Sequence, residues 1–329
     1  MGFLLAVILS FVPAFACAAF VYWLDRYEKE PRLLLGAVFF WGAVVAVIGA
    51  LVAQLILAGA VTAATGSERA ADVAGSTLFA PITEESLKGI AILGVFLILR
   101  REFDSVLDGI VYAAVVALGF AATENVFYLY GEFTEHGMDG LLTLFVVRVV
   151  LGIWNHPFYT AWMGIGLALS RLSPRAWVRW LASPLGWAAA LGFHSLHNTL
   201  ATFAEQTPGL GLLMFLVDWF GWLAICILIF VSIRREGRLL GTHLAEEVGL
   251  GRLTDAQYRT ATSSWAQTGA RIRTLVGAGR RPTRRFYQVC GELAHKKAQL
   301  ARLGDEGRNT ALVEKLRAEL AGLSGQAIC

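Results

Sequence analysis

Residues 78–99 decide the fold, and they read LFAPITEESLKGIAILGVFLIL. This run is long enough to cross a bilayer, because a helix of about 20 apolar residues spans the hydrocarbon core. It nevertheless carries Glu84, Glu85 and Lys88. An ionisable side chain at the centre of a membrane helix costs on the order of 3 kcal/mol or more, and such residues usually mark a function. The run therefore predicts a membrane helix that contributes to a polar centre.

Six more apolar runs of comparable length accompany this one. The seven together cover residues 2–23, 34–60, 78–99, 108–130, 141–169, 184–203 and 211–233. Of the 329 residues, 56% are hydrophobic and only 16% are charged, whereas a globular domain is about 25% charged. We therefore expect an all-α fold, a polytopic helical membrane bundle of about seven transmembrane helices.

The charges in the connecting loops predict an orientation. The first, third and fifth loops are basic; they contain Arg26, Lys29, Arg32, Arg100, Arg101, Arg171, Arg175 and Arg179. The second loop has only Arg69, and the fourth and sixth have no Lys or Arg. Because basic loops stay in the cytoplasm, we expect a multi-pass protein of the cell membrane with its N-terminus outside and its C-terminus in the cytoplasm.

The composition changes at Arg234. Residues 234–329 hold 17 Lys and Arg against 9 Asp and Glu, a balance of +8, and residues 1–233 have a balance of −5. We expect residues 1–233 to form the membrane core and 234–329 a basic cytoplasmic tail, with amphipathic helices at 293–303 and 310–323. The cluster of Arg280, Arg281, Arg284 and Arg285 fits anionic lipid headgroups, and no module for nucleic acid accompanies it.

Other predicted spans carry polar residues at a similar depth. Counted from the expected outer ends, these residues lie roughly 9–14 Å down at 1.5 Å per residue; they are Glu84, Glu85, Glu124, His156, His194 and His197. Scattered structural residues would not be expected to share one level. The common depth predicts that four helices bring their polar groups together.

Each residue also has a purely structural interpretation. Glu84 and Lys88 lie four apart and can neutralise each other on one helix face, whereas we expect no such local partner for Glu85. His156 can satisfy a carbonyl that Pro157 leaves free in a kinked span. Pairs such as Glu124-Asn125 and His194/Asn198 can be hydrogen-bonding contacts. We expect Arg148 to be a snorkelling interfacial residue and Asp218 to be an interfacial or structural acid.

Taken together, the polar residues favour hydrolysis. Carboxylates beside imidazoles can move the protons of a water molecule, and both groups are ligands for zinc or another divalent ion. The sequence has no His-Glu-x-x-His and no Gly-x-Ser-x-Gly motif, and it lacks a glycine-rich phosphate loop. The main alternative is a proton- or ion-coupled transporter, which also buries acids and histidines, although no half-to-half repeat is evident. A third is a membrane adaptor that works through its tail.

At these residues the chain resembles the PrsW-type intramembrane proteases, which are related to the CAAX-processing and Abi endopeptidases. Five ordered segments carry the resemblance: Asp25-Arg-Tyr-Glu28-Lys-Glu30-Pro31, Glu84-Glu85-Ser-Leu-Lys88, Phe120-Ala-Ala-Thr-Glu124-Asn125, His156 with Thr160 and Gly164-Ile-Gly166, and His194-Ser-Leu-His197-Asn198. They cover roughly residues 20–235. His197 is an addition to the usual His-x-x-x-Asn pattern, and the tail lies outside the resemblance.

The resemblance implies an intramembrane endopeptidase in which glutamates activate water and histidines bind a metal or the oxyanion. It also implies membrane-anchored substrates, such as anti-sigma factors, that are cut on the outer side of a bacterial membrane. The expected catalytic residues are Glu84, Glu85, Glu124, His156, His194 and Asn198, with Glu85 or Glu84 as the general base. The expected ligands for zinc or another divalent metal are Glu124, His156 and His194.

Overall fold

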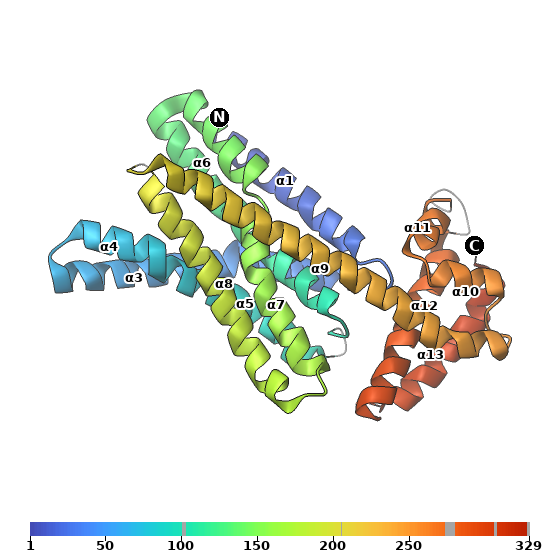
Figure 1. Ribbon diagram of the computed structural model, residues 1–329. Helices are drawn as coiled ribbons and strands as arrows, with labels where there is room; N and C mark the ends of the chain where they lie inside the picture. The colour runs from blue at the N-terminus through green and yellow to red at the C-terminus, as the bar shows by residue number, and fades with distance from the viewer. Residues whose placement is uncertain (101–102, 205, 274–279, 306–307, 328–329) are drawn as a thin grey trace. The chain divides into compact units, whose positions relative to one another are not determined.

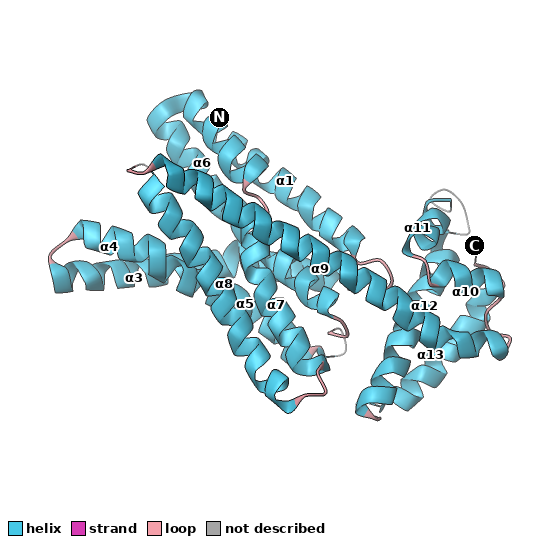
Figure 2. Cartoon of the chain, viewed as in Figure 1, coloured by secondary structure: helices cyan, strands magenta, loops and turns pink. Residues whose placement is uncertain are grey.

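The computed structural model describes residues 1–100, 103–204, 206–273, 280–305 and 308–327, and all regular elements in these ranges are helical (Figures 1 and 2). The chain divides into two compact units. We call Met1–Trp23 with Glu30–Leu228 the membrane unit, and Leu24–Lys29 with Ile229–Cys329 the tail unit.

The membrane unit contains these helices in chain order: α1 (Gly2–Leu24), α2 (Arg32–Phe40), the π-helical turn η1 (Trp41–Ala46), α3 (Val47–Thr65), α4 (Glu68–Ala74), the π-helical turn η2 (Gly75–Phe79), α5 (Ala80–Ile98), α6 (Val106–Phe145), the π-helical turn η4 (Val146–Leu151), α7 (Asn155–Leu172), α8 (Ala176–Ala204) and the first part of α9 (Pro208–Gly249).

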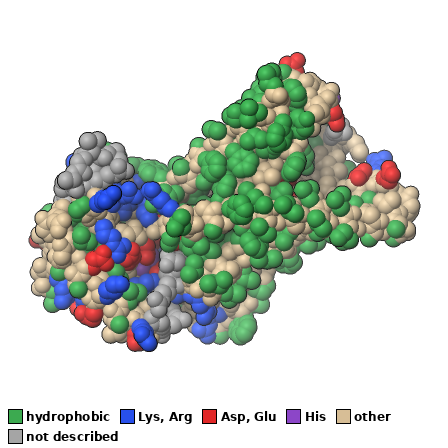
Figure 3. Space-filling model, turned by 180° about the vertical axis from the view of Figure 1, so that it is seen from behind, with side chains coloured by type: hydrophobic (Ala, Val, Ile, Leu, Met, Phe, Trp, Pro, Cys, Tyr) green, Lys and Arg blue, Asp and Glu red, His purple; other side chains and the backbone are tan. Residues whose placement is uncertain are grey.

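Several of these helices suit a membrane. Four stretches within the described residues are long and apolar enough to cross one: Gly2–Leu24, Arg32–Thr65, Val106–Leu172 and Pro208–Gly249. Large apolar side chains such as Leu33 and Leu55 are exposed on the membrane unit, and hydrophobic groups are spread over its visible face in Figure 3. A water-soluble surface would not carry so many. The predicted all-α membrane bundle is confirmed, while the number of crossings and their orientation stay predictions.

The centre of the membrane unit is the first half of α6, in which all residues from 107 to 122 are buried. Helix α7 packs between α6 and α8, and α5 contacts all three (Figure 1). Glycines allow this close packing. A Cβ on Gly164 would lie 2.0 Å from the Gly109 carbonyl oxygen in α6, and one on Gly166 would lie 2.4 Å from the Ala182 oxygen in α8. Small residues let helix backbones approach in this way, so α5 to α8 form one tight group.

The predicted run 141–169 does not form a single helix. Helix α6 breaks at Gly137, whose φ of 66° lies in the left-handed region, and then continues to Phe145. The turn η4 follows, and α7 begins only at Asn155. Pro157 therefore lies in the first turn of α7, where the missing N–H costs nothing, and not at a kink within a span. Arg148 and His156 therefore lie in different elements, η4 and α7.

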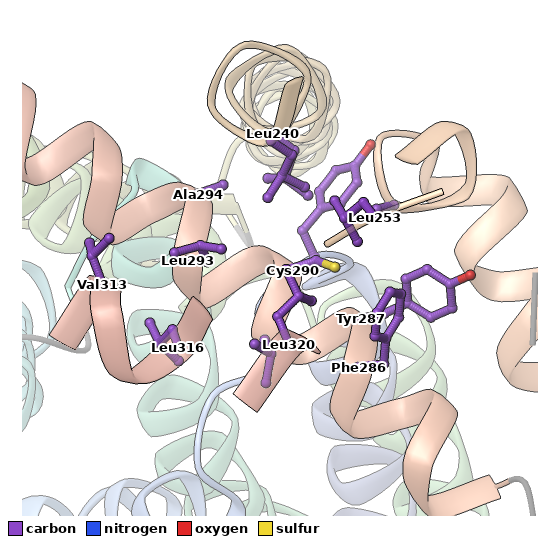
Figure 4. Close-up of a cluster of buried hydrophobic side chains, with 14 of the residues drawn as sticks. Leu240, Leu253, Phe286, Tyr287, Cys290, Leu293, Ala294, Val313, Leu316 and Leu320 are labelled. Atoms are coloured by element: carbon purple, nitrogen blue, oxygen red, sulfur yellow. The ribbon is translucent and has the colours of Figure 1, made fainter. Parts of the chain in front are cut away.

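The tail unit contains the end of α9 together with α10 (Asp255–Ala261), α11 (Ser264–Arg273), α12 (Arg280–Leu303) and α13 (Asn309–Ser324). The segments predicted to be amphipathic, 293–303 and 310–323, lie in α12 and α13. Their apolar faces meet in a buried cluster that is drawn in Figure 4 and includes Leu240, Tyr287, Cys290, Leu293, Leu316 and Leu320. The tail is thus a folded unit with a core of its own.

The tail unit also encloses residues 24–29 of the first predicted loop. The side chain of Tyr27 belongs to the apolar cluster and is 3% exposed. The Gln288 side chain accepts from the Lys29 amide at 2.9 Å and donates to its carbonyl at 3.3 Å, while Arg271 donates to the Arg26 carbonyl. Two segments more than 200 residues apart in sequence therefore share one core.

One member of the basic cluster, Arg285, forms ion pairs with acidic residues of the tail unit. Arg285 donates to Glu319 and Glu292 at 2.6–3.2 Å. The hydrogen bonds to Glu319 raise the pKa of the Arg285 guanidinium, and the same contact lowers the pKa of Glu319. Binding of this cluster to anionic lipid stays a prediction, and it depends on the other three arginines more than on Arg285.

Candidate active site

Helices α5, α6, α7 and α8, with the turn η4, bring the predicted polar residues together. Two histidines from different helices lie with their ring centroids 5.2 Å apart, His156 on α7 and His194 on α8. Around them stand three carboxylates, Glu84 and Glu85 from α5 and Glu124 from α6. The predicted convergence of four helices on one polar centre is therefore present, and its depth in the bilayer stays a prediction.

Glu85 is completely buried and fully engaged by donors. Its Oε1 lies 2.5 Å from Lys88 Nζ and 2.9 Å from His194 Nδ1, and its Oε2 accepts from the Thr160 hydroxyl at 2.8 Å. The expectation that Glu85 lacks a local partner is therefore wrong. Positions three apart on a helix are neighbours, as are positions four apart, and Lys88 lies closer to Glu85 than to Glu84, from which it is 4.0 Å away.

The contact with Glu85 fixes the tautomer of His194. A carboxylate only accepts, so His194 Nδ1 donates to it. In the neutral imidazole the lone pair is then on Nε2, which lies 3.8 Å from Glu84 Oε2. In many metal sites a histidine binds the metal through one ring nitrogen and donates the N–H of the other to a carboxylate, which orients the ring.

Glu84 differs from the other two carboxylates. Its Oε1 receives a long hydrogen bond of 3.3 Å from Gln54, and its Oε2 is buried without a hydrogen-bond partner among the described residues. A buried acceptor left unsatisfied costs on the order of 1–3 kcal/mol. Glu84 therefore presents the one carboxylate oxygen of the three glutamates that is both buried and without a donor.

Glu124 and His156 form a second carboxylate–imidazole pair. His156 Nε2 lies 2.9 Å from Glu124 Oε2, while His156 Nδ1 faces Lys88 Nζ at 3.3 Å. Arg148 donates to Glu124 at 2.7 Å and to Asn125 at 2.9 Å. The expectation of a snorkelling Arg148 is wrong, because the fold turns it inward onto an acid. His156 likewise bonds side chains here, in place of the carbonyl that a proline kink would have freed.

The residues fit a divalent metal ion. Ligand atoms of Glu84, His156 and His194 lie within 4.8 Å of one another. Three protein ligands drawn from histidine and carboxylate are the usual set of a catalytic zinc site, and the unpartnered Glu84 oxygen gains a partner when a cation binds. Glu124 was the predicted third ligand, but the group of ligand atoms that lie close together contains Glu84 and not Glu124. The geometry favours Glu84 in that place.

The balance of acidic and basic groups is compatible with a cation at this centre. The centre has three carboxylates and two basic side chains, Lys88 and Arg148, so the acidic groups outnumber these basic groups by one. Uncompensated charge is costly in a low-dielectric interior. A bound cation or a proton would remove the excess.

Two residues of the fourth motif face away from this centre. Asn198 donates to the Ser76 carbonyl at 2.8 Å and so ties α8 to η2. His197 Nδ1 lies 2.7 Å from Asp218 on α9. Within the part of the chain that the structure describes, neither residue is hydrogen-bonded to Glu84, Glu85 or Glu124. A catalytic role for Asn198 stays a prediction.

Sequence reasoning missed three members of the surroundings of the two histidines: Arg148, Tyr159 and Asp218. Arg148 and Asp218 did carry a signal, since an ionisable residue inside an apolar run normally has a partner within the bundle. Tyr159 carried none, because an aromatic residue in a membrane helix usually just packs. Its ring is stacked on His194 at 4.9 Å.

An all-helical membrane bundle with a buried centre of glutamates and histidines fits the class of intramembrane hydrolases. Similarity to known proteins narrows the class of protein further. The model of the PrsW family of intramembrane metalloproteases matches residues 30–231. Protease PrsW of Bacillus subtilis (strain 168) is 33% identical over 179 residues, which are 53% of this chain and 72% of that protein.

Two further relatives carry the same name. Protease PrsW of Geobacillus kaustophilus (strain HTA426) is 29% identical over 210 residues, 63% of this chain and 84% of the relative. Protease PrsW of Clostridioides difficile (strain 630) is 32% identical over 140 residues, which are 43% of this chain and 55% of that protein. No solved structure matches the chain. The chain belongs to the PrsW family and is an intramembrane protease, as its motifs predict; the comparisons give no support to the transporter alternative.

Proposed function

We propose that this protease hydrolyses peptide bonds of membrane-anchored proteins near the outer face of the membrane. The observation that carries the proposal is the unpartnered oxygen of Glu84, buried beside two imidazoles that come from two other helices. A carboxylate in that position can take a proton from a water molecule held between it and the histidines. Anti-sigma factors, which the family resemblance implies, are the first substrates to test.

The remaining residues hold this arrangement in place. Glu85 orients His194, and Glu124 orients His156, through hydrogen bonds to the ring nitrogens. Lys88 and Arg148 form ion pairs with these two carboxylates and hold them in place. Preorganised groups of this kind need no rearrangement when charge develops in the transition state. Glu84 is the member that is left to meet the reacting water.

Glu84, His156 and His194 would hold the metal that the family description implies; Glu84 would bind it through one carboxylate oxygen and keep the other to accept the proton of the water. When bound, a divalent ion such as zinc would supply a positive charge that acidifies water and stabilises a developing oxyanion. Glu84→Gln keeps a neutral oxygen at the site but cannot take a proton. We expect it to lose less metal than His194→Ala, which removes an imidazole ligand.

The central test is proteolysis by the purified protein. In detergent with membrane-anchored candidate substrates, Glu84→Gln should lower kcat by at least about 10², the contribution expected of a general base. Glu85→Gln should also be severe, because the amide cannot accept from three donors. Exposed Glu68→Gln on α4 is the matched control. Normal turnover in Glu84→Gln would refute the proposed role.

The metal has its own test. A chelator should abolish activity, and zinc should restore it. His194→Ala should lower both activity and metal content, while His197→Ala should be milder because its ring faces Asp218. A preparation that is free of metal, active and resistant to chelation would remove the metal from the mechanism and leave a glutamate-dependent hydrolase.

A further inference from the structure

A second polar cluster lies beside the candidate active site, on residues that the family motifs do not explain. Asp218 of α9 is 1% exposed and accepts three hydrogen bonds. Its Oδ2 lies 3.0 Å from Asn155 Nδ2 and 2.7 Å from His197 Nδ1, and its Oδ1 accepts from the Tyr159 hydroxyl at 3.0 Å. A buried carboxylate is stable only with such donors.

The donors to Asp218 are placed next to the two candidate histidines. Asn155 is the residue that precedes His156 at the start of α7. Tyr159, in the next turn, lays its ring against that of His194, with the centroids 4.9 Å apart and the planes at 21°. It also meets the His156 ring edge-on at 6.1 Å. Asp218 is thus hydrogen-bonded to direct neighbours of both imidazoles.

His194 is held from two directions. Glu85 fixes its Nδ1 edge, and Tyr159 covers one face of its ring. Tyr159 is itself fixed by the hydroxyl bond to Asp218 and is 1% exposed. If that bond is lost, the phenol can rotate or shift, and the imidazole loses the surface that sets its plane. Errors of about 1 Å in such groups are known to cost large factors in rate.

We propose that Asp218 is a positioning residue, which through Asn155, Tyr159 and His197 holds His156 and His194 in the orientation that the reaction needs. The inference rests on the proposed function of the two histidines. It also explains His197, the addition to the family pattern, as one of three donors that fix the Asp218 carboxylate between α7, α8 and α9.

The test uses the full-length protein and substitutions that change hydrogen bonding without changing shape. Asp218→Asn replaces one acceptor oxygen by a donor, so at least one of the three partners faces an N–H group. We expect kcat to fall by about 10- to 100-fold, the range found when groups behind metal-binding histidines are altered, with KM nearly unchanged. Exposed Asp72→Asn on α4 is the matched control.

Tyr159→Phe removes only the hydroxyl and provides a second variant if Asp218→Asn folds poorly. If Asp218 acts through Tyr159, the two substitutions are not additive, and Asp218→Asn has a smaller effect in the Tyr159→Phe background. The second readout is zinc affinity, measured by competition with a chromophoric chelator. We expect it to fall about tenfold or more in both single variants, without a loss of secondary structure.

The outcomes separate this inference from the proposed function. A wild-type protein that cleaves its substrate and binds zinc, with Asp218→Asn and Tyr159→Phe unchanged in kcat and zinc affinity, would overturn the inference alone. The inference would also be overturned if the effects of the two substitutions on kcat were fully additive and were accounted for by a lower melting temperature. Asp218 would then be a structural acid only. A wild-type protein that neither cleaves nor binds zinc would overturn the proposed function and this inference with it.

Discussion

At the scale of single residues, each candidate histidine has a carboxylate behind it, and each of these carboxylates has a cation. The same pattern occurs twice, as Lys88–Glu85–His194 and as Arg148–Glu124–His156. In a low-dielectric interior such chains of opposite charge strengthen one another. Glu84 lies beside the two chains without a comparable hydrogen-bond partner, which is why it is the proposed reactive group.

Arg148 offers a test of this pattern. Arg148→Gln should lower kcat by about 10- to 100-fold, because Glu124 would lose its cation and the orientation of His156 would loosen. Arg148→Lys should recover only part of the activity, since an ammonium cannot bridge Glu124 and Asn125 as the guanidinium does. Proteolysis of a membrane-anchored substrate is the measurement, with exposed Arg69→Gln as the control. Equal activity in Arg148→Gln and wild type would show that the ion pair is dispensable.

The sequence predicts which residues meet, but not all of their pairings. The shared depth of Glu84, Glu124, His156 and His194 follows from helix geometry and span boundaries alone. The partner of Arg148 does not, because Glu124 lies 24 positions away and is reached only through the reversal at Gly137. The direction of the Asn198 amide, toward η2, also depends on packing between helices that are distant in sequence.

At the scale of helices, the close packing of α6, α7 and α8 sets the spacing of the site. The apolar runs were sufficient to predict helices here, because their length and composition dominate. The break after 145 was not predicted, because the run 141–169 remains apolar across Gly152 and into Pro157. Hydropathy reports burial in lipid and is insensitive to a backbone reversal within an apolar stretch.

Gly164→Ala tests this packing. The added Cβ would lie 2.0 Å from the Gly109 carbonyl oxygen, so α6 and α7 must move apart. Overpacking of this kind costs about 1–3 kcal/mol, and thermal unfolding in detergent should register it as a lower melting temperature. Gly94→Ala on α5 is the matched control, because nothing lies within 4 Å of the new Cβ and alanine is the better helix former. Equal melting temperatures for both variants would contradict the tight α6–α7 contact.

At the scale of the whole molecule, residues 234–329 are basic in composition, yet they fold around an apolar core. The apolar periodicity predicted amphipathic helices at 293–303 and 310–323, and helices α12 and α13 are present there. Their burial of Tyr27 and residues 24–29 was not predictable, since the contact joins positions more than 200 residues apart. Composition cannot show that a short loop near the N-terminus completes the core of a distant segment.

The thiol of Cys290 reports on this core. It is fully buried in the cluster of Figure 4, and burial raises the pKa of the thiol well above its ordinary value. The thiolate is the reactive form, so Cys290 should resist alkylation near pH 8 in the folded protein and react after denaturation. A protein with Cys17, Cys226 and Cys329 replaced by serine isolates the signal. Tyr27→Ala should make Cys290 reactive without denaturant, because it opens the same core; rapid labelling of the folded protein would disprove the burial.

The shared core also constrains how the chain threads the membrane. Tyr27 packs in one core with residues of α12 and α13, so these segments lie on one side of the membrane. The chain between them therefore crosses an even number of times, and the six spans predicted from 34–60 to 211–233 satisfy this. The basic first loop predicts that this side is the cytoplasm. Reporter fusions at Ala71 and Gly137 should therefore report outside, and fusions at Phe103 and Arg175 inside. A cytoplasmic signal from Gly137 would contradict the orientation, and it would also remove Glu84 and His156 from the predicted outer half of the bilayer.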